Sequence, residues 1–130
     1  MTRIYVVTNG VYSDMYIAGA STNLADAARI IAEKACVESP AIEVFEGRDA
    51  IEGEGTLHFM YCNVINGNIS SPCEGVVYGV PENATIRPIV KAFPDANWGP
   101  QVFVIGTERS KVAQAFSDTL AAEATKRGWQ

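Results

Sequence analysis

The sequence predicts an α+β fold in which an antiparallel sheet carries two helices. Candidate strands follow one another closely and are joined by hairpin turns, which is typical of antiparallel sheets. Helical periodicity is confined to residues 24–37 and 108–126, and no βαβ series repeats. The 130 residues are 48% hydrophobic and 19% charged, which suits a single domain over residues 1–130. We expect both helices to cover one face of the sheet.

The first half is predicted to form a hairpin, a helix and a further strand. These elements are, in order, the strands 3–8 and 12–20, the helix 24–37 and the strand 41–46. Asn9-Gly10 is a strong turn signal between the first two strands. Ser21-Thr22-Asn23 offers N-cap side chains to the helix, and Ser39-Pro40 ends it. In the third strand Ile42 and Val44 share one face.

The second half is predicted to form further strands and a last helix. They are the strands 56–65, 76–80, 86–93 and 101–105 and the helix 108–126, with loops or turns at 46–55, 71–75 and 93–100. Asn66-Gly67 is a second tight-turn signal, and Pro88 suits an edge strand. In the helix, Val112, Phe116 and Leu120 lie on one apolar stripe.

Charge and cysteine content limit which partners and which cellular location the sequence predicts. The net charge of -5 argues against direct nucleic-acid binding. Residues 1–84 have four bases and eleven acids, a balance of -7, whereas residues 85–130 have six bases and four acids, a balance of +2. An anionic partner is therefore expected at the C-terminal third. The apolar start is too short for a signal peptide or membrane span, so a cytoplasmic location is expected. Cys36, Cys62 and Cys73 are predicted to be buried free thiols.

No motif in the chain points to catalysis. The single histidine, His58, falls inside a predicted strand, and scattered cysteines cannot complete a metal site with it. Nucleotide-binding and hydrolase signatures are absent from the sequence. We therefore expect a protein that is not an enzyme and that uses no cofactor and no metal.

The best candidate binding feature is the junction between the strand 101–105 and the last helix. Thr107, Arg109 and Lys111 bring a hydroxyl group and two cations to a helix N-terminus, where unpaired N–H groups attract anions. A phosphate is the expected ligand, with Arg109 as a bidentate donor. Ordinary helix capping is the alternative explanation of the same residues.

Two loops add candidate ligand contacts. In the segment 93–100, Phe93 and Trp98 could stack on a nucleobase and Asn97 could bond to a base edge or ribose, although these aromatic rings could instead plug the core. Near the first turn, Tyr12 and Asp14 could contact a ligand, or Asp14 could cap its own turn. Aromatic, amide and cationic groups within twenty residues of one another suit a phosphorylated, base-containing small molecule.

Self-association is expected from the C-terminus. The last helix is alanine-rich, which permits close helix approach, and Trp129 follows Gly128 with little chain left to bury its ring. Packing or exchange of this helix in a dimer would cover the ring. A frayed end with an exposed Trp129 is the alternative.

The segment Gly10-Val11-Tyr12-Ser13-Asp14 resembles a G-x-Y-S-D segment of small phage proteins. The whole plan is similar to the first described type of the phage Thoeris anti-defence family. That resemblance implies a dimer with exchanged C-terminal helices, or a hexamer, in the host cytoplasm. It implies a sponge that binds a cyclic ADP-ribose variant, or a cyclic oligonucleotide, without cleaving it. Arg109, Phe93 and Asn97 match the family's basic, stacking and amide residues by type, but Ala113 stands where a second arginine is expected.

Two alternatives of other classes stay open. One is an inhibitor that masks a host nuclease or effector with the acidic segment 38–54, which holds Glu38, Glu43, Glu46, Asp49, Glu52 and Glu54. The other is a nucleotide-processing enzyme, which would turn over the molecule it binds.

Overall fold

A computed structural model of the chain describes residues 2–10, 14–33, 39–81, 84–93 and 100–130. The α+β class and the antiparallel pairing are confirmed, since every strand pair is antiparallel. The described elements are β1 (Arg3–Asn9), β2 (Tyr16–Ser21), α1 (Leu24–Glu33), β3 (Ala41–Glu46), β4 (Asp49–Ile51), β5 (Gly55–Ile65), β6 (Asn68–Ile69), β7 (Cys73–Val80), β8 (Ile89–Phe93), β9 (Gln101–Gly106) and α2 (Arg109–Arg127).

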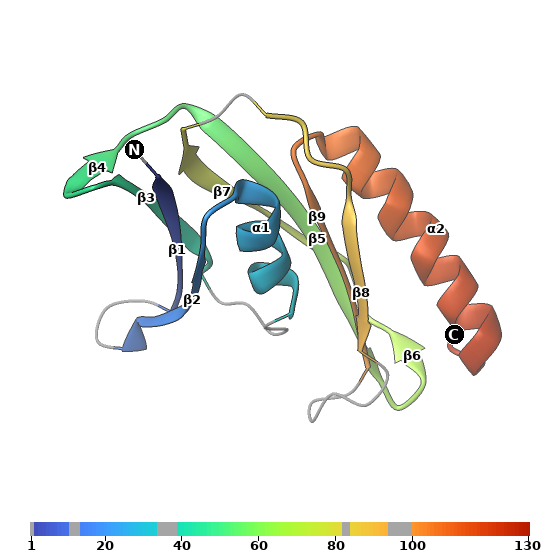
Figure 1. Ribbon diagram of the computed structural model, residues 1–130. Coiled ribbons are helices and arrows are strands. Elements are labelled where there is room, and N and C mark those ends of the chain that lie inside the picture. Colours follow the sequence, from blue (N-terminus) through green and yellow to red (C-terminus); the bar gives the residue numbers. More distant parts are fainter. Residues whose placement is uncertain (1, 11–13, 34–38, 82–83, 94–99) are drawn as a thin grey trace.

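The strands form two sheets rather than one (Figure 1). The first has the order β2-β1-β3-β4, and the second has β5 and β9 at its centre, with β8 beside β9 and both β6 and β7 beside β5. The sheets meet where β3 packs on β7. Helix α1 contacts β1 and β2 on one side and β8 and β9 on the other, so it fills the wedge between the sheets. Helix α2 covers the far face of the second sheet (Figure 1).

The expectation that both helices cover one face is therefore wrong, and β9 shows why. All six of its residues are buried. Phe103 and Ile105 belong to the cluster around α1, whereas Val102 and Val104 pack with Val112 of α2. A strand that is apolar on both faces needs cover on both sides, and the uninterrupted apolar run of residues 102–105 was the available signal.

Helix α1 confirms the predicted start. The side chain of Asn23 accepts a hydrogen bond from Asp26 N at 2.8 Å, as an N-cap does. Ala27, Ala28 and Ala32 are fully buried, and such small side chains let the helix lie close to both sheets. The described helix ends at Glu33, and the rest of the predicted helix lies outside the described residues.

Several turns and boundaries follow the sequence and others do not. Asn66 and Gly67 have φ values of 52° and 79°, so the predicted tight turn between β5 and β6 is confirmed. The predicted loop 46–55 contains the short strand β4, because residues 49–51 pair with β3. Strand β7 begins at Cys73, inside the predicted turn 71–75. Strand β8 begins at Ile89, so the first three residues of the predicted strand 86–93 are not in a strand.

The cysteine prediction is confirmed for one residue. Cys62 is buried and free. Cys73 is free but exposed, so its predicted burial is wrong, because among the described strands β7 pairs with β5 alone and lies at the sheet edge. Cys36 lies outside the described residues.

The C-terminus is fastened to its own chain. Val112 and Phe116 are buried against the second sheet, and Trp129 packs partly on the same cluster. Gln130 N donates to Gly67 O at 2.8 Å, and Ile69 N donates to Gln130 O at 2.9 Å. The alternative of a frayed end with an exposed Trp129 is therefore wrong, because the ring is partly buried against its own chain. In the described part of the chain, neither helix has the length and apolar character needed to cross a lipid bilayer.

Candidate functional site

The predicted anion site at the start of α2 is occupied by the protein's own groups. The Thr107 hydroxyl accepts a hydrogen bond from Ile86 N at 2.9 Å and lies 3.4 Å from Ile86 O. Thr107 therefore fastens the segment that precedes β8 to the end of β9. Its hydroxyl is engaged in the fold rather than left for a ligand.

Both predicted cations are also paired. Arg109 Nε and Nη2 donate to the two carboxylate oxygens of Glu74, at 3.1 and 2.9 Å. This hydrogen bonding lowers the pKa of Glu74 and raises that of Arg109. Lys111 Nζ lies 3.4 Å from Glu108 Oε1. A phosphate at this helix terminus would compete with two glutamates, in ion pairs that are about half exposed.

The second predicted group of contacts lies at the other end of β9. Phe93 is opposite Gln101, at the start of β9, whereas Thr107 follows its last residue. Five residue steps separate these ends, a distance of about 17 Å. One chain therefore does not bring Phe93 together with Arg109. Asn97, Trp98 and the side chain of Phe93 lie outside what the structure describes.

The third predicted group is further away. Asp14 is exposed and lies two residues before β2 in the first sheet, and Tyr12 lies outside the described residues. Helix α1 and the second sheet separate the first sheet from α2 (Figure 1). The structure does not bring Asp14 to the start of α2.

A pocket that the sequence did not indicate lies between α1 and the segment that leads into β8. Its volume is about 480 Å³, within the range of small-molecule sites. We name it the arginine pocket. It is lined by Ala25, Arg29, Thr85, Ile86, Arg87, Pro88 and Ile89.

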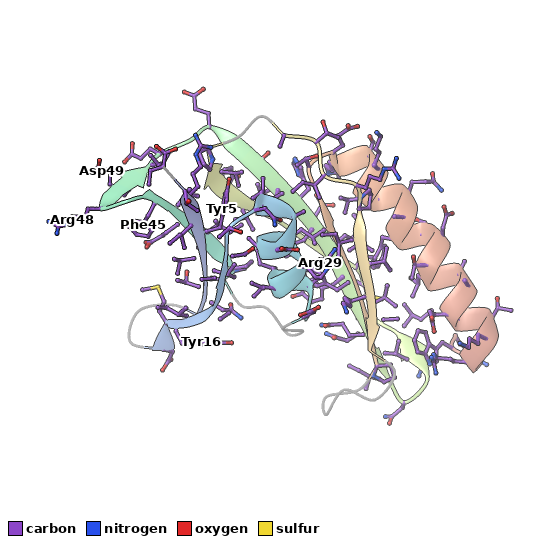
Figure 2. The ribbon with its side chains drawn as sticks, in the orientation of Figure 1. Tyr5, Tyr16, Arg29, Phe45, Arg48 and Asp49 are labelled. Carbon is purple, nitrogen blue, oxygen red and sulfur yellow. The ribbon has the colours of Figure 1, made fainter. Side chains whose placement is uncertain are left out.

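The arginine pocket has an excess of positive charge. Arg87 is exposed, and no carboxylate of the described residues lies within ion-pair distance of it. Arg29 projects from α1 (Figure 2). Its Nη1 lies 2.9 Å from Asp26 Oδ1. That pair is half exposed, with 52% and 48% of the two side chains accessible, so it is readily exchanged.

Local packing explains how this pocket forms. Thr107 holds Ile86 through its hydroxyl, which fixes one wall. A Cβ at Gly106 would lie 3.3 Å from Pro88 Cα and 3.4 Å from Ile86 O, so glycine permits the segment to approach β9 closely. Lys91, further along β8, lies 3.5 Å from Glu33 of α1 and joins strand to helix.

Sequence reasoning missed this pocket because its two arginines are far apart in the chain. Arg29 comes from α1, and Arg87 comes from a segment predicted as an edge strand. The available signal was the excess of basic residues after residue 85, to which Arg87 contributes.

Comparison of the chain with protein-family models, with curated proteins and with solved structures finds no match. The chemistry of the pocket is therefore the basis for assigning a function.

Proposed function

We propose that this protein binds a phosphate-bearing small molecule in the arginine pocket and sequesters it. One observation carries the proposal: Arg87 lines a pocket of about 480 Å³ and has no acidic partner among the described residues. An arginine guanidinium presents paired N–H donors that match phosphate oxygens. A ligand anion would supply the partner that the protein does not.

The other pocket residues suit the rest of such a ligand. Arg29 can exchange Asp26 for a second phosphate oxygen at low cost, since exposed ion pairs contribute about 0–1 kcal/mol. Thr85 offers a hydroxyl group. Ile86, Pro88 and Ile89 offer apolar surface to a base or to a ribose face. This combination favours a nucleotide over inorganic phosphate.

The resemblance to the phage Thoeris anti-defence family supplies the ligand class and the outcome. On that basis we propose a cyclic ADP-ribose variant or a cyclic oligonucleotide as the molecule held, released intact rather than cleaved. A homodimer or hexamer in the host cytoplasm belongs to the same proposal. The proposed site departs from the family expectation, because its phosphate grip is Arg87 with Arg29 rather than Arg109 with Lys111.

A thermal-shift series tests this function. The Tm of the purified protein is measured with cyclic ADP-ribose isomers and with cyclic di- and trinucleotides. Mass spectrometry then identifies the compound released on denaturation. A ligand at 100 times its Kd adds about 2.7 kcal/mol to the free energy of unfolding. With an unfolding entropy of about 2.1 cal/mol/K per residue, this raises Tm by about 10 °C for a chain of this length. A shift with an altered compound would indicate an enzyme, and no shift with any of them would overturn the proposal.

Matched variants locate the site. Arg87→Gln removes the unpaired cation of the pocket, whereas Arg109→Gln removes an equal charge from the exposed pair with Glu74. Hydrogen bonds to charged groups contribute about 1.5–3 kcal/mol, so Arg87→Gln should weaken binding by about 10- to 150-fold. Arg109→Gln should leave the affinity within about twofold.

A further inference from the structure

A second cavity lies where the first sheet loses its edge strand. The pairing of β4 with β3 ends at Val44 and Ile51, after which the chain turns away through Gly53. Gly53 packs so tightly that an added Cβ would lie 2.1 Å from Pro81 Cα. The resulting cavity has a volume of about 590 Å³. We name it the acidic pocket, and it is lined by Ile42, Glu43, Val44, Phe45, Ala50, Ile51, Glu52, Gly53 and Gly79.

The two glutamates of this pocket have no cationic partner in the part of the chain that the structure describes. Among the described acids, Asp14, Asp49, Glu54 and Asp118 likewise have no described Lys or Arg partner, whereas others do. Glu46, on the same strand as Glu43, lies 2.7 Å from Arg3, and that hydrogen bond lowers the pKa of Glu46. The other described acids that pair with a described Lys or Arg are Asp26, Glu33, Glu74, Glu108 and Glu123.

The walls of the pocket are apolar. Phe45 and Ile51 line it together with the two glutamates. Figure 2 shows Phe45 on β3 and places Arg48 and Asp49 at the tip of the β3–β4 hairpin. A pocket lined by both carboxylates and apolar side chains fits a long cationic side chain, because Lys and Arg carry a charged head on an aliphatic stem.

The backbone around the pocket favours a polypeptide over a small cation. Since β4 pairs only with residues 44–46, no described strand pairs with the β4 side of β3 at Ile42 and Glu43, although β3 also packs on β7. An unpaired strand edge presents N–H and C=O groups that an extended segment can pair with. The balance of -7 over residues 1–84 would also attract a basic partner from a distance.

We propose that the acidic pocket docks a Lys or Arg side chain from an extended segment of a partner protein, with Glu43 and Glu52 as its counter-ions. This interaction is separate from the arginine pocket and does not depend on the ligand proposed there. The pockets have no lining residue in common.

NMR titration of the full chain tests the proposal. The probe is the peptide acetyl-Leu-Arg-Leu-Lys-Leu-amide, added to the ¹⁵N-labelled protein while the amide signals of Gly53 and Gly79 are followed. The control peptide replaces both basic residues with glutamine. We expect saturable shifts of both glycine signals with the basic peptide, at least tenfold weaker binding of the control, and weaker binding at higher salt.

Charge-neutral variants supply the second arm. Glu43→Gln together with Glu52→Gln should weaken peptide binding at least tenfold, whereas Glu54→Gln, an exposed acid outside the pocket lining, should change it less than twofold. Amide spectra of each variant check that it is folded, and the single variants serve if the double variant is not. The proposal is overturned if the basic and control peptides bind equally, if the double variant binds normally, or if spermidine binds and the basic peptide does not.

Discussion

Replacing Thr107 with valine should loosen the wall of the arginine pocket while keeping the shape of the side chain. Valine has the size of threonine but lacks the hydroxyl that accepts the hydrogen bond from Ile86 N at 2.9 Å. The longer contact with Ile86 O, at 3.4 Å, contributes less. The segment that carries Arg87 would then be held only by packing and by the strand that follows it.

The expected cost follows from that single good bond. A typical intramolecular hydrogen bond contributes about 0.5–1.5 kcal/mol, and an N–H left unpaired adds to the loss. Ile86 is only half-buried, so water can partly replace the hydroxyl. We therefore expect Thr107→Val to lower the free energy of unfolding by about 1–2 kcal/mol. At about 0.27 kcal/mol/K for a chain of 130 residues, Tm falls by about 5 °C.

Urea unfolding and hydrogen exchange measure this effect. The Ile86 amide should exchange faster in Thr107→Val, and the midpoint of unfolding should fall with an unchanged m-value. Thr107→Ser keeps the hydroxyl and is the matched control, so it should retain most of the protection. The reasoning is refuted if serine and valine lower protection equally, or if the valine variant exchanges like the wild-type protein.

Four further predictions test the packing, the helix cap and the thiols. Gly75→Ala places a Cβ 2.3 Å from the Phe59 ring, which stacks on Phe103, and should cost about 1–3 kcal/mol in urea unfolding; a neutral result contradicts the tight contact. Ile31→Ala empties a site between the sheets and should cost about 2–5 kcal/mol, against less than about 1.5 kcal/mol for Ile31→Val. Asn23→Ala removes the cap of α1 and should cost about 1 kcal/mol, with serine restoring most of it. Burial raises the pKa of the buried Cys62 thiol. Iodoacetamide should therefore modify the exposed Cys73 faster than Cys62, and faster modification of Cys62 would contradict this. The stability that neutral Cys62 contributes should be complete below its ordinary pKa and be lost as the pH rises through its raised pKa.

Local patterns in the sequence predicted most of the elements. Helix α1 and strands β1, β3, β5 and β9 were predicted because their apolar spacing and flanking caps are local features. Strand β4 was missed because its three residues are held by pairing with β3 rather than by their own composition. The division into two sheets was missed because it depends on packing between β3 and β7, which are far apart in the sequence.

The candidate site was harder to predict for the same physical reason. Thr107, Arg109 and Lys111 had the residue types of an anion site, but distant or neighbouring groups satisfy each of them. Sequence spacing cannot show that Glu74 lies beside Arg109, since β7 and α2 meet only through the folded sheet. Conversely, Arg87 lies in no sequence motif, and only the structure shows that it lines a pocket beside α1.

The central claim is that Arg87 and Arg29 hold the phosphates of a nucleotide in the arginine pocket. The most direct measurement is an NMR titration of the ¹⁵N-labelled protein with cyclic ADP-ribose, followed at the arginine Nε–H signals. The proposed site predicts saturable shifts of Arg87 and Arg29 together with the amides of Thr85 and Ile89, while Arg109, paired with Glu74, stays unchanged. Shifts confined to Arg109 and the first turn of α2 would contradict it and return the site to the helix N-terminus.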